Sequence, residues 1–276
     1  MGSSGFQLFE FLVSFGYCFA RIERRKIDLM KSLVCISKVP DTTTKVTFTD
    51  NNTKFNEENV QYIVNPYDEW YSLVRALELK EAKGEGTVTV VNVGPADNEQ
   101  TIRKALAIGA DDAVRIDAQP TDGYYTAAQI AAHAKDKGYD LVWAGSESID
   151  YNGFEVGGML AELLGLPYVQ NATSIDYDGS SATLVRNIEG GQETLSVHSP
   201  FVLSTQKGMA EARIPNMRGI MQAKKKPLEV ISPVEAENLT EITKFEHPPE
   251  KGEVKMIDPE NVEELVDLLQ NEAKVL

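Results

Sequence analysis

The chain has 276 residues, of which 42% are hydrophobic and 25% are charged, a composition typical of folded globular proteins. This length allows one large domain, with or without an appended arm. The formal net charge is −15 at pH 7, and such an acidic surface repels phosphate backbones and anionic lipids. Composition therefore argues against nucleic-acid binding and stable membrane insertion, and we interpret the basic run Lys224–Lys226 as a solvated turn.

The first 29 residues are expected to form an N-terminal extension outside the fold. The apolar stretch Phe6–Ala20 precedes a basic run at residues 21–26, whereas a secretory signal places its positive charge first. The stretch is also shorter than the roughly 20 residues of a membrane span; a helix that touches a membrane surface is the alternative. Cys18 and Cys35 lie in very different contexts, and both are interpreted as reduced thiols.

From Met30 onward, short apolar runs alternate with amphipathic stretches. Strands are expected at residues 33–39, 87–93, 113–116 and 141–144, and helices at residues 65–84, 98–108, 121–138 and from the turn after residue 144 to residue 165. Residues 46–65 read as a hairpin or long loop, and Asn65 is expected to cap the helix that follows it. Strands separated by helices in this way predict an α/β fold with a mostly parallel twisted sheet and helices on both faces.

The character of the chain changes after Gly165. Residues 174–204 predict a β-rich segment, and residues 207–221 an irregular loop. Residues 227–258 contain prolines without a long period and predict an extended arm, which ends in an amphipathic helix at residues 261–274. The apolar stripe of that helix suits a partner, although packing against its own domain is nearly as good a reading.

These boundaries give three expected parts. Residues 1–29 are the N-terminal extension, residues 30–226 a nucleotide-binding α/β domain, and residues 227–276 a C-terminal arm and helix.

The segment Gly145–Gly158 carries the strongest local signal for a ligand. It follows a strand and precedes a helix, and its small residues allow the backbone to approach a ligand closely. Unpaired N–H groups and the dipole at a helix start favour an anion such as phosphate. The segment matches neither a dinucleotide fingerprint nor a P-loop, so a bare structural turn remains an equally good reading of the pattern alone.

No catalytic set and no metal-ligand spacing occur in the sequence. His133, His198 and His247 are scattered, and each is interpreted as a surface or packing residue. Cys35 is interpreted as a small buried hydrophobe, and Asp150 as a loop-bracing residue. The domain is therefore expected to bind rather than to catalyse.

Five segments of the chain resemble electron transfer flavoprotein β subunits, and they occur in the order found in that family. They are Leu33–Asp41, Asn65–Glu69, Gly94-Pro95 with Thr101–Asp111, Ile149-Asp150, and Met221–Glu229. The resemblance covers essentially residues 31–276. It implies a fold like that of the adenine nucleotide alpha hydrolases, with a β-rich segment and an extended C-terminal arm ending in a helix that contacts an α subunit.

The resemblance implies an electron carrier rather than an enzyme. In this family a heterodimer with an α subunit holds one FAD, which takes electrons from acyl-CoA and other dehydrogenases of fatty acid oxidation. The electrons pass to a membrane quinone reductase, and the β subunit holds a structural AMP. The expected location is the cytoplasm, or the mitochondrial matrix if the source is eukaryotic. One alternative is a flavin-bifurcating member with a second FAD in place of AMP; another is a free-standing adenylate-binding protein.

Positions that match the family's pattern imply the cofactor contacts. They are Cys35, Asn65, Pro66, Tyr67, Asp68, Val93, Gly145, Ser146, Glu147, Ser148, Ile149, Asp150, Tyr151, Asn152, Gly153, Phe154, Glu155 and Val156. Among them, Tyr67 falls where a family aromatic approaches the flavin. Glu155 departs from the family's usual Gln, and a carboxylate beside phosphate is repulsive unless it turns outward.

The family also has a loop that recognises partner dehydrogenases through one apolar side chain. The matching residues here are Thr205, Gln206, Lys207, Gly208, Met209, Ala210, Glu211, Ala212, Arg213 and Ile214. Met209 falls at the anchor position, and its small neighbours lead us to expect an exposed side chain; a buried packing residue is the alternative.

Overall fold

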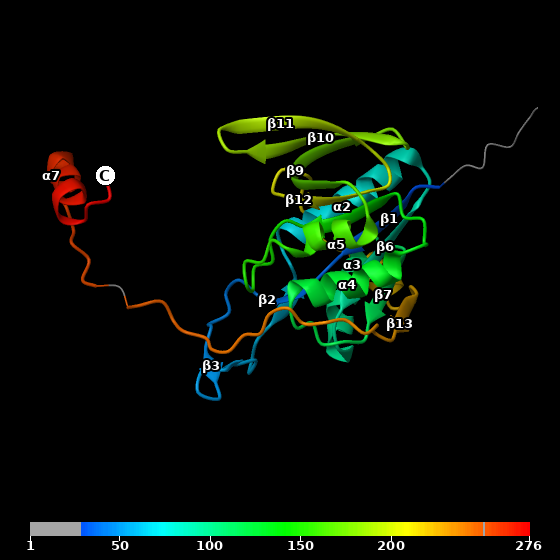
Figure 1. The fold of residues 1–276 in the computed structure, drawn as a ribbon, viewed down its shortest axis with the longest axis horizontal. Coiled ribbons are helices and arrows are strands. Elements are labelled where there is room, and N and C mark those ends of the chain that lie inside the picture. Colours follow the sequence, from blue (N-terminus) through cyan, green and yellow to red (C-terminus); the bar gives the residue numbers. More distant parts are fainter. Residues whose placement is uncertain (1–28, 251) are drawn as a thin grey trace, which may run out of the picture. The chain divides into compact units, whose positions relative to one another are not determined.

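The computed structural model describes residues 29–250 and 252–276, in two compact units (Figure 1). The main unit comprises the described residues up to Lys45 together with Glu57–Glu241, and the second comprises Val46–Asn56 and Ile242–Leu276. The expectations for the N-terminal extension and for Cys18 fall on residues outside the described ranges. Within these ranges, no helix is both long enough and apolar enough to cross a bilayer.

The main unit is built on one sheet, which has nine strands among the described residues, in the order β11-β10-β9-β12-β8-β1-β6-β7-β13. The strands are β1 (Lys31–Cys35), β6 (Thr87–Val93), β7 (Asp112–Ile116), β8 (Leu141–Gly145), β9 (Tyr168–Tyr177), β10 (Ser181–Ile188), β11 (Gly191–His198), β12 (Phe201–Thr205) and β13 (Leu228–Ile231). All neighbours from β9 through β12 to β13 pair in parallel, and only β9-β10-β11 pair antiparallel. The predicted α/β class with a mostly parallel sheet is confirmed.

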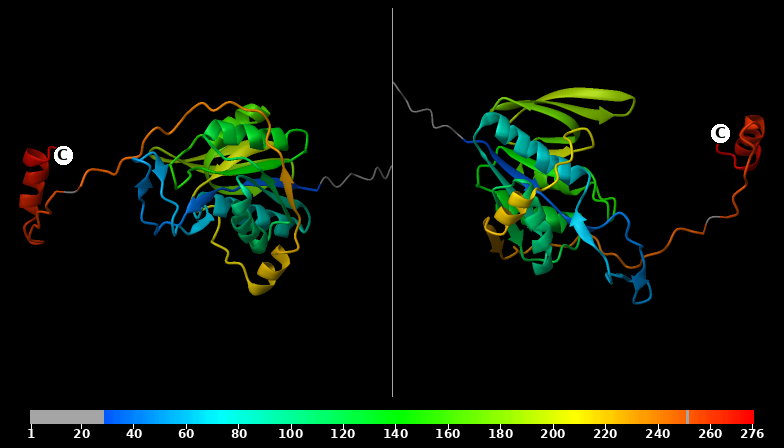
Figure 2. Two further views of the ribbon diagram at one scale, coloured as in Figure 1. Left: turned by 90° about the horizontal axis from the view of Figure 1, so that it is seen from below. Right: turned by 180° about the vertical axis from the view of Figure 1, so that it is seen from behind.

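Helices cover both faces of the sheet (Figure 2). Helices α2 (Asp68–Lys83) and α3 (Glu99–Ile108) pack in one apolar cluster with side chains such as Trp143 and Phe201. Helices α4 (Gly123–Ala134) and α5 (Val156–Leu164) pack in a second cluster on the other face. Apolar side chains point alternately to the two faces, so the central strands are buried on both sides, as their continuous apolar runs predict.

Capping residues near the helix starts predict where α4 begins but not where α2 begins. The Asp122 carboxylate accepts a 2.6 Å hydrogen bond from Tyr125 N and caps α4, as Ser, Thr, Asn and Asp commonly do. The expected cap of α2 by Asn65 is wrong, because that helix begins at Asp68 and has Tyr67 at the cap position without a side-chain bond. The Asn65 amide is instead used in a long-range contact described below.

The β-rich segment after Gly165 forms as predicted. Strands β9, β10 and β11 make a meander, with a turn at Asp178-Gly179 and another before Gly191. Strand β12 then returns to the parallel core and pairs with both β8 and β9. A small antiparallel pair, β2 (Lys38–Pro40) with β5 (Tyr62–Val64), lies between β1 and α2 in the sequence.

Two short elements were not expected from the sequence. The segment predicted to be an irregular loop ends within helix α6 (Met217–Ala223), which is capped by the Asn216 side chain and packs on α3. Strand β13 adds to the sheet beside β7, so the main unit continues to Glu241, beyond the expected boundary at residue 226. Both elements are too short for a periodic pattern to mark them.

The segment after β13 is hydrogen-bonded along α4. The buried Gln129 amide donates to Val234 O and accepts from Val234 N, both at 2.8 Å. The Asp122 carboxylate, besides capping α4, accepts from Leu239 N and Thr240 N. The first part of the predicted arm therefore belongs to the main unit.

The second unit contains a hairpin and the C-terminal helix. Strands β3 (Phe48–Thr49) and β4 (Lys54–Phe55) form the hairpin, and the Phe48 ring stacks on Phe245 with ring centroids 4.9 Å apart. Helix α7 (Val262–Asp267) starts at an Asn261 cap and ends in a π-helical turn, η2 (Leu268–Glu272). Its apolar side chains, among them Leu265, are exposed within the described residues.

Candidate functional site

The order of the strands reverses at β1. The chain runs from β1 to β6 and β7 on one side, and then places β8 on the other side of β1. The carboxyl ends of β1, β6 and β8 lie at the same edge because these strands are parallel (Figure 1). In open α/β sheets, ligands bind outside the carboxyl ends of the strands at such a switch point. The structure therefore brings together Cys35, Val93 and Gly145, three predicted site residues from distant parts of the chain.

The start of α2 holds the loop that follows β8. Asn65 Nδ2 donates to Glu147 O at 2.7 Å, and Asp68 Oδ2 accepts from Glu147 N at 2.8 Å. Both backbone groups of Glu147 are thus bound by two predicted site residues. The other amide atom, Asn65 Oδ1, is buried and has no hydrogen-bond partner among the described residues. A buried acceptor without a donor is costly, so this oxygen suits a donor group supplied by a ligand.

Glu69 is buried at the same place and was not predicted as a site residue. Its carboxyl oxygens accept from Ser37 N at 2.6 Å and from Ser37 Oγ at 2.8 Å, in the segment after β1. Burial raises the pKa of Glu69 to about 8, because desolvation outweighs the two bonds from Ser37, which lower it. Only its place after Asn65 in the sequence could have drawn attention to it.

Gly145 is required by the close approach of α2. A Cβ at this position would lie 2.9 Å from Glu69 Cγ and 3.3 Å from Asp68 Cβ. A larger residue would push the loop after β8 away from the helix. Gly145 is therefore small because α2 packs closely against it.

A network of hydroxyl groups lies beneath the loop after β8. Ser146 Oγ is 3.0 Å from Ser204 Oγ, which also accepts from Tyr168 Oη at 3.0 Å. Ser72 Oγ donates to Ala144 O at 2.8 Å, and Thr205 Oγ1 donates to the backbone oxygen of Asp68 at 2.7 Å. These hydrogen bonds fix β8, β12 and α2 relative to one another. Of the five residues whose hydroxyl groups form them, only Ser146 and Thr205 were predicted from the sequence as site residues.

The middle of the loop closes on itself. Ser148 N donates to Gly153 O at 3.1 Å, and Asn152 N donates to Ser148 O at 2.7 Å. Asp150 accepts from Tyr151 N at 2.9 Å and from the Ser148 hydroxyl, in keeping with its interpretation as a loop-bracing residue. The Tyr151 and Phe154 side chains are exposed, at 62% and 49%, and therefore present apolar surface at the edge of the site.

The first turn of α5 ends the predicted loop. Val156 and the next residues begin this helix, and N–H groups in a first turn have no acceptor within the helix. The Glu155 side chain leans over the start of α4, since a Cβ at Gly123 would lie 2.4 Å from Glu155 Cγ. Its carboxylate oxygens also lie close to Gly153. The first turn of α5 therefore offers backbone donors, while the Glu155 carboxylate lies against two glycines.

The remaining predicted cofactor residues differ in exposure. Pro66 and Ile149 are half-buried, and the Tyr67 ring is 51% exposed beside the start of α2. The Cys35 side chain is buried, and desolvation raises the pKa of its thiol far above the ordinary value. At neutral pH this thiol is protonated and unreactive, so Cys35 can meet a ligand only through its backbone.

The segment Thr205–Ile214 does not expose the side chain expected to be its anchor. Met209 is only 4% exposed and packs in the larger apolar cluster, so the expectation of an exposed Met209 is wrong. The nearby apolar side chains that do reach the surface are Ile214 and Met217, at 86% and 74% exposure. Arg213 is fixed by two bonds to the Glu81 carboxylate on α2, at 2.7 and 3.0 Å.

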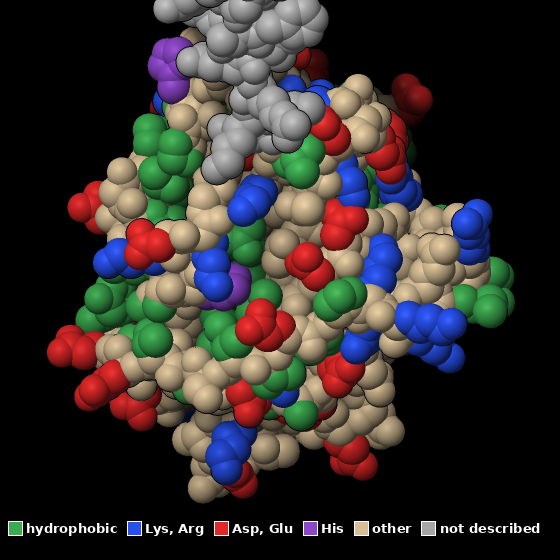
Figure 3. All heavy atoms as spheres, turned by 90° about the vertical axis from the view of Figure 1, so that its right-hand side faces the viewer, with side chains coloured by type: hydrophobic (Ala, Val, Ile, Leu, Met, Phe, Trp, Pro, Cys, Tyr) green, Lys and Arg blue, Asp and Glu red, His purple; other side chains and the backbone are tan. Residues whose placement is uncertain are grey.

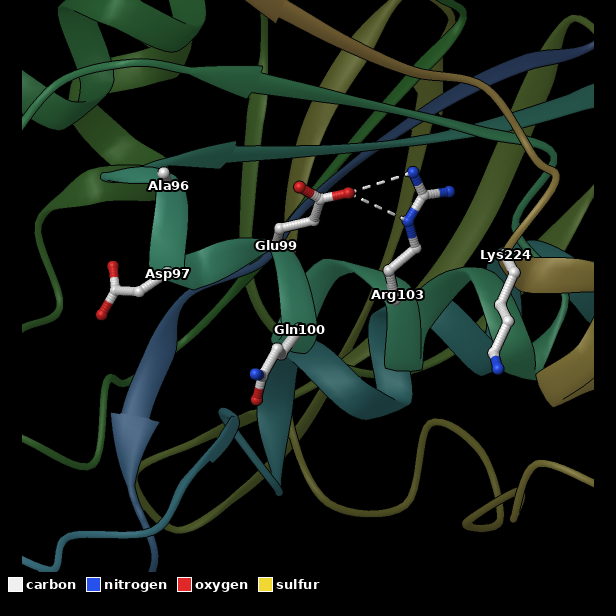
Figure 4. A pocket seen from close by; sticks show the side chains of 6 residues that line it. All are labelled: Ala96, Asp97, Glu99, Gln100, Arg103 and Lys224. Atoms are coloured by element: carbon white, nitrogen blue, oxygen red, sulfur yellow. Dashed lines mark hydrogen bonds and ion pairs between the residues drawn. The ribbon is translucent and has the colours of Figure 1, made fainter.

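An open hollow of about 550 Å³ lies beside α3 and is lined by Ala96, Asp97, Glu99, Gln100, Arg103 and Lys224 (Figure 4). None of the predicted cofactor residues lines it. Arg103 bonds to Glu99 and to the backbone oxygens of Ala223 and Lys226, and Asp97 pairs with Lys38. These charged groups hold protein segments together, so the hollow is a weaker candidate than the carboxyl edge.

Charge does not single out another region on the face of the molecule shown in Figure 3. This face is the right-hand side of Figure 1, where β1 enters the sheet, and acidic and basic side chains are interspersed on it. The carboxyl edge is thus the strongest candidate, because there an unpaired buried oxygen and a helix start without a side-chain cap accompany the switch point.

Comparison with known proteins identifies the family of the chain. The model of the electron transfer flavoprotein domain matches residues 52–236, which include the loop after β8. The electron transfer flavoprotein subunit beta of Bacillus subtilis (strain 168) is 36% identical over 262 residues, covering 90% of this chain and 100% of that protein.

Other relatives carry the same name. The subunit beta of Syntrophomonas wolfei is 33% identical over 250 residues, covering 89% of this chain and 98% of that protein. The mitochondrial subunit beta of Arabidopsis thaliana is 32% identical over 254 residues, covering 90% of this chain and 100% of that protein. These names describe an electron carrier rather than an enzyme. The chain therefore belongs to the electron transfer flavoprotein family, as a β subunit.

Proposed function

We propose that this chain pairs with an α subunit to form an electron transfer flavoprotein whose β subunit holds a structural AMP. The single observation that carries the AMP proposal is the pair of unpartnered polar groups at the carboxyl ends of β1 and β8. There Asn65 Oδ1 has no donor among the described residues, and the start of α5 has no side-chain cap, which leaves its first N–H groups available to an anion. An adenylate has hydroxyl and amino groups that donate and a phosphate that accepts, so its chemistry matches both deficits.

The residues present fit an adenylate held mainly by the protein backbone. The amides from Phe154 to the start of α5 would face the phosphate, and Cys35 and Val93 would contribute their backbone groups. The Glu155 side chain leans over Gly123, but its carboxylate oxygens also lie close to Gly153, so this carboxylate would have to turn outward beside a phosphate. The proposed AMP site comprises Cys35, Asn65–Asp68, Val93 and Gly145–Val156.

The flavin would supply the redox chemistry, as a bound FAD does in such carriers. The contribution of this chain is to position groups around it. The half-exposed Tyr67 ring would pack against the flavin at the boundary with the α subunit. The C-terminal residues 227–276 would contact the α subunit through exposed apolar side chains such as Leu265.

Electrons would come from acyl-CoA and related dehydrogenases and would pass to a quinone reductase. The docking segment would be Thr205–Ile214, whose exposed apolar side chain is Ile214. An exposed apolar group beside a fixed Arg213–Glu81 pair suits transient docking, because transient interfaces combine an apolar centre with a polar rim.

Co-expression with an α subunit, followed by analysis of the released nucleotides, tests the proposal. We expect a yellow heterodimer that releases one FAD and one AMP. Release of two FAD and no AMP would identify a flavin-bifurcating member instead. A stable, colourless monomer that carries an adenine nucleotide would favour a free-standing adenylate-binding protein and would contradict the proposed heterodimer.

A further inference from the structure

Glu69 touches both of the chain segments that leave the switch point. Its two carboxyl oxygens accept from Ser37 N and Ser37 Oγ, in the segment after β1. Its Cγ lies beneath Gly145, the last residue of β8, where an added Cβ would come within 2.9 Å. One side chain therefore sets how close the two segments approach.

Two residues close to Glu69 in the sequence, Asn65 just before α2 and Asp68 at its start, complete this contact. Asn65 and Asp68 bind both backbone groups of Glu147, two residues after Gly145. Asn65, Asp68 and Glu69 thus form a clamp around the start of α2. Asn65 and Asp68 bind the loop after β8, and Glu69 binds the segment after β1. Asn65 Oδ1, the unpaired buried oxygen, belongs to the same clamp.

We propose that Glu69 is a positioning residue of the adenylate site, and that it holds the segments after β1 and β8 at the spacing that lets both contact one nucleotide. This inference rests on the proposed function. It goes beyond the proposed function by assigning a role to Glu69, a side chain that the predicted cofactor contacts do not include.

The ionisation of Glu69 gives this role a signature that a packing residue would lack. The titratable groups that face its carboxyl are Asp150 in the loop after β8 and the Cys35 thiol at the end of β1, and Asp68 precedes it on α2. Burial and, to a smaller extent, Asp150 raise the pKa of Glu69 to about 8, while hydrogen bonds from Ser37 and Asn65 lower it. Below pH 8 the site therefore contains a neutral Glu69, and above pH 8 it gains a negative charge that opposes a phosphate.

The sign of the effect on nucleotide affinity follows from this ionisation. If the neutral form binds the nucleotide, the dissociation constant is constant well below pH 8 and rises above it. Between pH 7 and pH 9 the increase is roughly tenfold for one proton with this pKa. Glu69→Gln keeps an acceptor for Ser37 N and can donate to Ser37 Oγ, but it cannot ionise, so its affinity should not change with pH.

Titration of the nucleotide-depleted heterodimer with AMP at pH 7, 8 and 9, by calorimetry, tests the proposal. The wild type should lose affinity roughly tenfold between pH 7 and pH 9, Glu69→Gln should change by less than about twofold, and Glu85→Gln should follow the wild type. Glu85 is an exposed residue at the opposite edge of the sheet, after α2, so Glu85→Gln controls for loss of a carboxylate. Flavin content, read from absorbance, reports that each variant has assembled.

Ser37→Ala gives an independent check if Glu69→Gln fails to assemble. Removing the hydroxyl removes a bond that lowers the pKa of Glu69, so the loss of affinity should shift to higher pH. Identical pH profiles for the wild type and Glu69→Gln, or an unshifted profile for Ser37→Ala, would overturn the role of Glu69 while leaving the AMP site in place. A wild-type heterodimer that binds no AMP at any pH would overturn the proposed AMP site as well.

Discussion

Two neighbouring glycines in the first turn of α5 have different surroundings. A Cβ at Gly157 would lie 2.7 Å from Tyr168 Oη, whereas a Cβ at Gly158 would meet Tyr168 Cε1 at an ordinary 3.7 Å. Gly157→Ala should lower the free energy of unfolding by about 1–3 kcal/mol, because either the helix start or the Tyr168 ring, whose hydroxyl is bonded to Ser204, must move. Gly158→Ala should be neutral or raise it by about 0.5–1 kcal/mol, since alanine favours the helix.

Urea unfolding of the purified protein measures both values. The two substitutions add the same methyl group one residue apart in the same helix, so Gly158→Ala is the matched control. Equal effects of the two substitutions would show that contact with Tyr168 does not limit the position of the helix.

Met209 gives a second prediction at the level of a single residue. Its side chain is buried in the larger apolar cluster, whereas Met217 is 74% exposed. Met209→Ala should lower the free energy of unfolding by about 2–4 kcal/mol, because it leaves a cavity. Met217→Ala should change it by less than about 0.5 kcal/mol.

Thermal or urea unfolding distinguishes the two methionine variants. A Met209→Ala protein as stable as the wild type, with slower electron acceptance from a dehydrogenase, would restore the anchor role that burial argues against. The sequence could not reveal this burial, because small neighbours such as Gly208 and Ala210 do not determine which way the methionine points.

At the level of elements, the end of α3 is held by the segment that follows α6. The Lys226 ammonium donates to Leu106 O and Ala110 O, at and just beyond the end of α3. Partial burial lowers its pKa, and a cation at a helix C-terminus is favourable. The interpretation of the basic run as a solvated turn therefore holds for Lys224 and Lys225, which are exposed, and is wrong for Lys226.

Lys226→Ala should lower the free energy of unfolding by about 1–3 kcal/mol, because it leaves two backbone oxygens without their charged donor. Lys225→Ala is the matched control and should change it by less than about 0.5 kcal/mol. Hydrogen exchange of α6 and β13 should also become faster in Lys226→Ala alone. Similar exchange in the two variants would mean that Lys226 does not hold this part of the chain.

Long elements could be predicted from the sequence, and short ones could not. Apolar runs such as Thr87–Val93 and amphipathic stretches such as that of α2 carry enough residues to show a period. Helix α6 and strand β13 have 7 and 4 residues, too few for the same test. The cap of α2 was mispredicted for another reason, since a long-range bond to Glu147 uses the Asn65 side chain.

At the scale of the whole molecule, the candidate site depends on strand order, which no local pattern contains. The loop after β8 could be predicted from its small residues and its position before a helix. The clamp at the start of α2 could not, because Asn65 and Glu147 are 82 positions apart and meet only once β8 lies beside β1. Glu69 was missed for the same reason, since its partner Ser37 belongs to another loop of the same edge.

The position of β12 has a consequence for synthesis of the chain. This strand pairs with β8 along Phe201–Thr205, and Thr205 donates to the backbone oxygen of Asp68 at the start of α2. A nascent chain emerges from the ribosome from its N-terminus. The ribosome therefore makes β1, α2 and β8 before β12, the strand that pairs with β8 and bonds to the start of α2. Nearly three quarters of the polypeptide must therefore be made before the candidate site is complete, so a ligand that needs both β12 and α2 in place can bind only late in synthesis.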